Sequence, residues 1–278
     1  MLLDKPAGIT SHDAVQRVRR VFRTRAVGHT GTLDPFATGL LVALVGRATR
    51  LARFVEGQPK TYLAEARLGF ATDTDDLTGA PLAEPAPVEV SAAAVRDALE
   101  SFRGRQEQRP PAFSAKHVGG ERSHRLARRG ETVELSPVTV EVTEIELLEL
   151  AGDRVRFRVT VSAGTYVRAI ARDLGERLGC GAHLVALRRE RIGRLSVGDA
   201  VPLDALGPDT PLLPPQAVLP DLPLRMLDAA EAEAVRHGRA IPGTAHAGTV
   251  GLVSNGALLA VGEVADGMIQ PRVVLEGA

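Results

Sequence analysis

The sequence predicts an α+β fold, in which a mixed, mostly antiparallel sheet with flanking helices precedes a small β-barrel-like C-terminal domain. Three observations lead to this fold class. Residues 138–162 alternate between apolar and polar side chains, residues 10–22 and 165–179 have helical apolar spacing, and glycine-split strands follow residue 223. Because long antiparallel segments are mixed with helices, the pattern disfavours a doubly wound parallel sheet.

The chain begins with a predicted strand and a predicted helix. Residues 1–9 indicate a short strand that ends at the turn formers Pro6 and Gly8. The helix over 10–22 opens with Thr10 and Asp13, the spacing of a helix start signal. Its apolar residues fall on one face and its arginines lie off that face.

Three further elements follow before the first long loop. Residues 39–46 form an apolar run between glycines, which is typical of a fully buried strand. Residues 48–55 return to helical spacing, and residues 61–69 favour another strand. The Pro/Ala/Glu segment at 80–90 is expected to be a surface loop.

The clearest β signal is a hairpin, with strands at 138–149 and 154–162 joined by a turn at 151–153. One face of this hairpin is polar, so we expect it to face solvent. The helix predicted over 165–179 follows directly.

A proline-rich connection divides the chain. Residues 206–223 hold six prolines, which exclude a regular helix or a central strand. We therefore expect one domain over 1–220 and a second over 221–278, the latter a small β barrel.

The composition limits the possible classes of protein. With 44% hydrophobic residues the 278-residue chain can fill a core, so wholesale disorder is not expected. Its one cysteine, Cys180, excludes an internal disulfide and a cysteine-based zinc site. No basic-then-apolar leader and no apolar run of about 18 residues is present, so we expect a cytoplasmic protein without a membrane partner.

Charge is unevenly distributed although the net charge is zero. Residues 1–60 carry ten Lys/Arg against four Asp/Glu, and residues 101–131 carry eight against three. Residues 61–100 carry two against eight, and residues 221–278 carry four against seven. The two basic zones could form a polyanion-binding face, or they could pair with the acidic zones across the surface.

Asp34 is the first candidate site residue, and its pattern allows two interpretations. Followed by Pro35, it could cap a helix whose first residue is proline. Against this, glycines surround it at Gly28, Gly31 and Gly39. Gly39 follows so soon that little room is left for a helix that Asp34 could cap. A basic zone that contains His29 adjoins the acid. A carboxylate in a basic groove repels nucleic acid, so its presence there indicates that the charge does chemistry.

Metal and cofactor motifs were sought and none fits. "TDTDD" at 72–76 resembles the start of a calcium loop, but Leu77 and Thr78 occupy its fifth and sixth positions. We interpret it as a solvated acidic turn in which a carboxylate could bind a basic neighbour. No histidine spacing suits zinc, and no phosphate loop or Gly-x-Ser-x-Gly occurs. No metal and no cofactor is therefore predicted.

Three more segments carry candidate residues. In "AGTYVRAIARDLG", Arg168 and Arg172 lie one helical turn apart. They could lie on a solvated basic face. Alternatively, Tyr166 and Arg168 could point into a cleft, where the arginine would orient Asp34. Tyr62 could be core packing or a stacking platform for a base. The basic segment 113–131 could be a solvated loop or a loop that closes over nucleic acid.

Several motifs together resemble one family. They occur in the order and spacing of bacterial tRNA pseudouridine-55 synthases, the TruB family, from residue 2 to the end of the chain: "LLDKPAGITSHDAV", "GHTGTLDPFATGLL", "KTYLAEARLG" with "TDTDD", "SAGTYVRAIARDLG" and "LGCGAHLVALRR". The second of these is long and highly specific. The resemblance implies the pseudouridine synthase fold for residues 1–220 and a PUA-like RNA-binding domain for 221–278.

The resemblance also implies an activity, its substrate and residue roles. Uridine 55 in the T stem-loop of tRNA would be isomerised by base flipping, by a monomer that needs no cofactor and no guide RNA. Asp34 would be the catalytic aspartate, and the other residues would bind substrate or arrange the site: Tyr62, Tyr166, Arg168, His29 and Asp76. The 113–131 segment would clamp the RNA. Phe113 departs from the family pattern, because other members have a tyrosine there.

Overall fold

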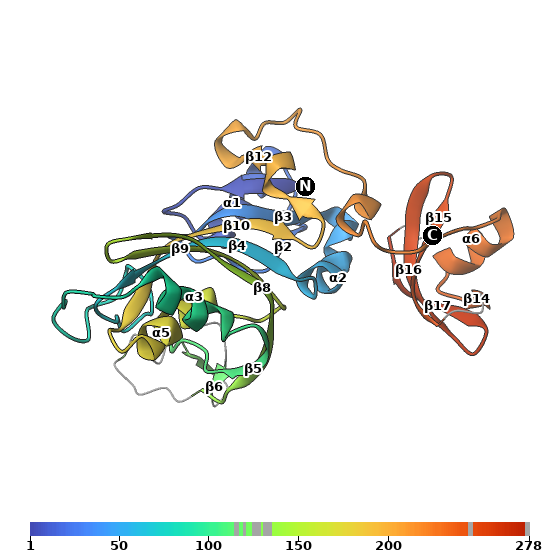
Figure 1. The fold of residues 1–278 in the computed structure, drawn as a ribbon. Helices are drawn as coiled ribbons and strands as arrows, with labels where there is room; N and C mark the ends of the chain where they lie inside the picture. Colours follow the sequence, from blue (N-terminus) through green and yellow to red (C-terminus); the bar gives the residue numbers. More distant parts are fainter. Residues whose placement is uncertain (114–116, 119–120, 124–128, 130–134, 244–246, 276–278) are drawn as a thin grey trace. The chain divides into compact units, whose positions relative to one another are not determined.

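β-Strands make up most of the regular structure in the computed structural model (Figure 1). The model describes the whole chain except residues 114–116, 119–120, 124–128, 130–134, 244–246 and 276–278. The chain divides into two units, each described here by itself. The first contains Met1–Pro35, Leu40–Gly57 and Arg194–Ala278, and the second contains Phe36–Gly39 and Gln58–Gly193.

The N-terminal elements of the first unit confirm the predicted strand, helix, strand and helix, and one short strand that was not predicted lies between the first helix and the buried strand. These elements are β1 (Leu2–Lys5), α1 (Ser11–Val21), β2 (Val27–Thr30), β3 (Thr38–Val45), a 3-10 turn (Gly46–Leu51) and α2 (Ala52–Glu56). β2 runs antiparallel to β3, while β1 lies between β3 and the short parallel strand β12 (Val201–Pro202). Apolar residues of α1, β1 and β3 form one buried cluster.

The start of α1 forms as its sequence predicts. The Thr10 hydroxyl accepts a hydrogen bond from the Asp13 backbone at 3.1 Å, and the Asp13 carboxylate accepts one from the Thr10 backbone at 2.9 Å. This reciprocal capping box satisfies two backbone donors that a helix N-terminus otherwise leaves without an intrahelical acceptor.

The second unit contains the predicted hairpin. Its elements are β4 (Lys60–Leu68), α3 (Ala92–Glu100), β5 (Gly104–Gln108), β6 (His117–Val118), β7 (Glu121–Arg122), β8 (Val138–Ala151), β9 (Arg154–Val161), α5 (Val167–Arg177) and β10 (Ala182–Ile192). Neighbouring strands are antiparallel in the order β10-β4-β9-β8-β5, and the first residues of β3, Thr38 and Gly39, pair in parallel with β10. α5 packs on β10, and α3 packs on β8 (Figure 1). The mixed, mostly antiparallel sheet is therefore confirmed.

The C-terminal strands form a sheet of their own. They are β13 (Leu224–Met226), β14 (Ile241–Pro242), β15 (Gly248–Ser254), β16 (Ala257–Ala265) and β17 (Met268–Val274), in the order β13-β15-β16-β17-β14. Helix α6 (Ala229–Arg236) packs on this sheet around a separate apolar cluster. The domain boundary at residue 220 stays a proposal, because the two units divide the chain elsewhere.

Several of the described elements are absent from the sequence prediction. They include the helices α3 and α6 and the strands β2, β5 and β10. The two helices are short, and β10 carries four arginine or glutamate residues after its apolar stretch, so neither a helical nor a strand period stands out. The connection 206–223 holds only a 3-10 turn at Pro215–Val218, as its prolines require.

Among the described residues, no helix combines the length and apolar character needed to cross a bilayer.

Gly39 is required where β3 meets β10. It has φ +101°, and a Cβ at this position would lie 2.3 Å from the Arg189 carbonyl oxygen. We expect Gly39→Ala to lower the free energy of unfolding by roughly 2–4 kcal/mol, from backbone strain and overpacking together. Gly46→Ala is the control, because its φ is +63° and no atom lies within 4 Å of the added carbon. Equal losses in chemical denaturation would contradict the packing argument.

Candidate active site

Asp34 lies in the loop between β2 and β3, and its side chain is half-buried. Pro35 and Phe36 form a turn, and β3 begins at Thr38. The interpretation of Asp34 as a helix cap is therefore wrong, because no helix follows it. Too few residues separate Pro35 from the strand to complete a helical turn.

The backbone on both sides of Asp34 is fixed by hydrogen bonds. The Ser11 hydroxyl accepts from the Leu33 backbone nitrogen at 2.9 Å and lies 3.2 Å from the Leu33 carbonyl oxygen, to which it donates. On the other side, the Gly8 backbone nitrogen donates to the Pro35 carbonyl at 2.8 Å. The loop therefore holds the carboxylate at a defined position without a helix beneath it.

Lys5 adds a buried cation to the same loop. Its side chain is fully buried, and Nζ donates to the carbonyl oxygens of Pro6 and Ile9 at 2.8 Å and of Pro35 at 3.4 Å. A buried ammonium group is costly unless acceptors surround it, so these carbonyls fix the turn after β1 as well as the Asp34 loop. Lys5 and Ser11 lie within the first family motif, but their positions in the sequence do not reveal this role.

His29 belongs to the same unit as Asp34. It lies on β2 opposite Ala43 of β3 and is half-buried. The short loop from Thr30 to Asp34 connects the two residues, so the first unit carries both the predicted catalytic aspartate and the histidine that is predicted to support flipped nucleotides.

Arg168 is buried at the start of α5, with 5% of its surface exposed. Its guanidinium donates to the carbonyl oxygens of Thr74 and Phe113, each at 3.0 Å, and to Asp76 Oδ2 at 3.4 Å. The alternative of a solvated basic face is therefore wrong. The contact with Phe113 uses a backbone oxygen, so it does not depend on whether the side chain at this position is phenylalanine, as here, or the tyrosine of other family members.

Asp76 lies at the centre of the acidic turn and is 4% exposed. Its Oδ1 accepts from the Thr74 and Thr78 hydroxyls and from the Thr78 backbone, at 2.6–2.9 Å. The turn is joined to β10, because the Leu184 backbone bonds to Asp75 and Leu77. The prediction of a solvated turn is wrong for Asp75 and Asp76, which are buried, whereas the prediction that a carboxylate of this turn binds a basic neighbour is confirmed by Arg168.

A second ion pair lies beside the first, and the sequence singled out its arginine but not its acid. Arg172 donates to Asp75 Oδ2 at 3.0 Å and to the Arg109 carbonyl oxygen at 3.0 Å, and it also contacts Asp173. Burial raises the pKa of Asp75 to about 6, because desolvation outweighs the attraction of Arg172 and Arg168. The one-turn spacing of Arg168 and Arg172 could have revealed these ion pairs, because two arginines one helical turn apart can each meet one of two adjacent acids on a facing turn.

Tyr166 and Tyr62 complete the predicted residues of the second unit. Tyr166 is the residue before α5, and the buried Gln108 amide bonds to both its backbone nitrogen, at 2.8 Å, and its carbonyl oxygen, at 3.1 Å. Tyr62 lies on β4, is 7% exposed, and is placed between Val159 of β9 and Arg189 of β10. Gln108 is thus a positioning residue that sequence patterns did not reveal.

The structure brings Asp76 and Arg168 into contact, and it places the predicted residues in two units. His29 and Asp34 lie in the first unit, and Tyr62, Asp76, Tyr166 and Arg168 lie in the second. The pairing of Asp34 with Arg168 would involve residues of both units and stays a prediction. The predicted clamp at 113–131 lies largely outside the described residues, apart from the short ladder of β6 and β7.

The raised pKa of Asp75 predicts a pH-dependent stability difference. Between about pH 4 and pH 6 the folded protein keeps a proton on Asp75 that the unfolded chain, with a pKa near 3.8, has lost. Stability from this group is therefore lost as pH rises to about 6. Asp75→Asn removes this titrating group. The free energy of unfolding of the variant minus that of wild type should therefore rise by up to roughly 3 kcal/mol as pH rises from about 4 to about 6.

The measurement is urea denaturation of both proteins from pH 4 to pH 8 in the same buffer series. Groups common to both proteins cancel in the difference. The difference should level off above pH 6, and a difference that stays flat or falls between pH 4 and pH 6 would contradict the burial argument.

Comparisons with known proteins place the chain in a family. The model described as "TruB family pseudouridylate synthase (N terminal domain)" matches residues 19–167, and two C-terminal models of the same family match residues 168–209 and 224–275. Proteins named tRNA pseudouridine synthase B are similar over nearly the full chain. The one from Solibacter usitatus is 43% identical, with 99% of each chain covered, and the one from Thermobifida fusca is 45% identical, with 100% of this chain and 98% of the relative covered.

Solved structures show the same fold. A chain from the crystal structure of a Cbf5-Nop10-Gar1 complex has a TM-score of 0.75 and 26% identity, covering 99% of this chain and 84% of that one. A chain from an H/ACA RNP bound to a substrate RNA also has a TM-score of 0.75, at 24% identity and the same coverage. The family models and the relatives together show that the chain belongs to the TruB family of pseudouridylate synthases.

Proposed function

We propose that this enzyme converts uridine 55 in the T arm of tRNA to pseudouridine, with Asp34 as the nucleophile. The observation that carries the proposal is the half-buried Asp34 carboxylate on a loop whose backbone is bound on both sides, with no helix to cap. The names of its relatives, tRNA pseudouridine synthase B, support tRNA as the substrate.

Access to the uridine requires base flipping. A base within a folded RNA arm is stacked, and extruding it costs a few kcal/mol. Tyr62 would stack on the extruded uracil and return part of this cost, and His29 would support the neighbouring nucleotides. A tyrosine on a strand suits this role, because its backbone is held by neighbours on both sides.

Arg168 would keep Asp34 ionised and oriented. Its own contacts support this role, because Thr74, Asp76 and Phe113 hold the guanidinium in one orientation. A guanidinium that is already oriented can bind a carboxylate at a smaller entropic cost. Its positive charge also lowers the pKa of a neighbouring acid, which favours the nucleophilic form.

The reaction is an isomerisation whose atoms balance within the nucleoside. Asp34 bonds either to C6 of the base or to C1′ of the sugar, and both alternatives remain open. The N1–C1′ bond breaks, the base rotates, a C5–C1′ bond forms, and the bond to Asp34 breaks to restore the carboxylate. C5 then loses its proton and N1 gains one, so no net oxidation occurs and no co-reactant is consumed.

Two alternatives make different predictions. A non-catalytic RNA-binding protein would use the same basic zones but would not need Asp34. A guide-RNA-dependent enzyme is suggested by the H/ACA complex among the structural neighbours, although that likeness is one of fold. The proposal commits to a protein that acts on tRNA alone.

Replacing Asp34 separates the proposal from the binding-only alternative. We expect Asp34→Asn to reduce turnover at least roughly a thousandfold, since the covalent step loses its nucleophile, while RNA affinity stays within about threefold of wild type. The assay is tritium release from a bare tRNA transcript labelled at uridine C5, with affinity measured by filter binding. Asp97→Asn, an exposed acid on α3, is the matched control and should keep full activity.

A transcript with cytidine at position 55 tests the target. It should release no tritium although its other uridines are labelled. Three results would each contradict the proposal. They are substantial turnover by purified Asp34→Asn, tritium release from the altered transcript equal to that from the normal one, and no turnover by wild type without added guide RNA.

The hydrogen bonds of Ser11 predict that its replacement lowers kcat as well as stability, whereas loss of the neighbouring helix cap lowers stability alone. Ser11→Ala leaves the buried Leu33 backbone without its partner, so we expect kcat to fall roughly tenfold to a hundredfold as Asp34 moves, with a loss of about 1–3 kcal/mol in stability. Thr10→Ala removes the cap of the same helix at a cost of about 1 kcal/mol and should leave kcat unchanged. If both variants lower kcat equally at a temperature where both are folded, Ser11 acts only through α1 stability.

A further inference from the structure

We propose that the arginine cluster at the C-terminal end of α1, formed by Arg19, Arg20, Arg23 and Arg25, binds backbone phosphates of the substrate RNA outside the arm that carries the reacting uridine. This inference rests on the proposed function, because it concerns the same RNA. It assigns a second contact surface that is separate from the Asp34 loop.

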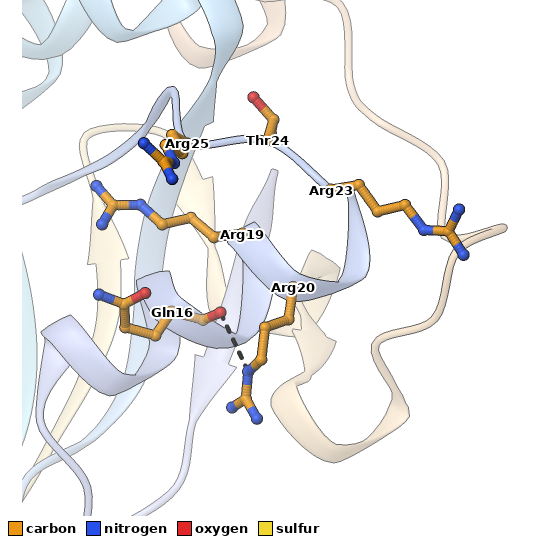
Figure 2. Close-up of a pocket in the computed structure, with 6 residues that line it drawn as sticks. All are labelled: Gln16, Arg19, Arg20, Arg23, Thr24 and Arg25. Carbon is orange, nitrogen blue, oxygen red and sulfur yellow. Dashed lines mark hydrogen bonds between the residues drawn. The ribbon is translucent and has the colours of Figure 1, made fainter.

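The arginine cluster borders a cavity of about 530 Å³ (Figure 2). Gln16 and Thr24 complete its lining. Figure 2 shows the guanidinium groups of Arg19 and Arg25 pointing to the same side as Gln16, whereas Arg20 and Arg23 point in other directions. Cations spread over a helix end and a loop suit successive phosphates of a polymer better than one compact anion.

The charge of this segment is not balanced locally. The sequence has no acidic residue between Asp13 and Asp34, a stretch that contains five arginines. Within the part of the chain that the structure describes, no carboxylate forms an ion pair with any residue of the arginine cluster. Arginines on the sheet behave differently, because Arg67, Arg154 and Arg158 each pair with an acid. Clustered cations repel one another, so a polyanion would relieve a cost that the folded chain bears.

Helix stabilisation accounts for only half of the arginine cluster. Arg19 and Arg20 lie in the last turn of α1, where cations interact favourably with the helix dipole. Arg19 also donates to the Val27 carbonyl oxygen at 3.0 Å, but its buried Nε makes no hydrogen bond to any described residue. Arg23 and Arg25 lie beyond the helix, so the dipole does not explain them.

Arg23 occupies a position that favours glycine. The Thr24 backbone nitrogen bonds to the Arg19 carbonyl oxygen at 3.1 Å, which closes a Schellman-type helix end. Arg23 is the residue within that turn, and its φ is +51°, in the left-handed region. An arginine here carries backbone strain that glycine would not, and strain of this kind is often retained where a side chain has a function.

The position of the arginine cluster along α1 separates it from the reacting nucleotide. Ser11, at the first turn of α1, contacts the loop that carries Asp34. The 11 residues of α1 span about 16 Å, so the cluster lies a helix length away from that contact. A uridine held at Asp34 is therefore out of reach of these side chains, so the phosphates that they meet belong to other nucleotides, which we assign to a part of the RNA outside the reacting arm.

The test compares two RNAs: a full-length tRNA transcript and the isolated T-arm stem-loop. The variants are Arg23→Gly and the double variant Arg20→Gln with Arg25→Gln, and the control is Arg96→Gln, an exposed arginine on α3. Affinities are measured by filter binding at several salt concentrations, and folding is followed by thermal denaturation. Arg23→Gly separates a loss of RNA binding from a loss of folding, because this variant should melt at or above the wild-type temperature.

We expect the double variant to bind full-length tRNA roughly tenfold more weakly and to reduce the slope of log affinity against log salt by about 2, one unit for each lost phosphate contact. Arg23→Gly should weaken the same RNA about threefold. Stem-loop affinity should stay unchanged in all variants, and Arg96→Gln should match wild type on both RNAs.

Two results would overturn the inference. One is an equal loss of affinity for the stem-loop, which would assign the arginine cluster to the reacting arm. The other is unchanged affinity and salt slope on both RNAs. Failure of the proposed function is distinguishable, because it would appear as wild-type protein that binds both RNAs without forming pseudouridine.

Discussion

A buried cation has to find hydrogen-bond acceptors, and the candidate site is built around that constraint. Lys5 in the first unit and Arg168 in the second are both removed from water. Each meets the constraint mainly with backbone carbonyl oxygens, and in both cases at least one of these belongs to a segment that is distant in sequence. Since breaking such an arrangement leaves an uncompensated buried charge, the surrounding loops are fixed together with the cation.

This arrangement explains why so much of the site lies on loops and yet is well positioned. The Asp34 loop is held by Ser11, Gly8 and Lys5, and the acidic turn is held by Leu184 of β10 and by two arginines of α5. Loops anchored on regular elements in this way can carry catalytic groups without loss of precision. The family membership and the proposed nucleophile are consistent with such a design.

The same residue type serves two purposes in this chain. Arg168 and Arg172 lie inside the fold, where carboxylates and carbonyl oxygens satisfy them. The arginine cluster of α1 lies at a surface cavity, and its charge is not offset nearby. Interior arginines thus organise the enzyme, whereas the clustered ones are suited to a negatively charged polymer.

The sequence by itself determined the local elements and the identity of the candidate residues. The capping box of α1, the alternating hairpin β8–β9 and the proline-rich connection depend on neighbours a few residues apart, so their patterns are visible in the chain. Motif resemblance singled out Asp34 and its companions. Only the tertiary structure decided that Asp34 caps no helix, that Asp76 and Arg168 are buried together, and that Asp75, Gln108 and Lys5 support them. Burial and pairing join segments tens of residues apart, and no local period records which distant partner a charged side chain will meet.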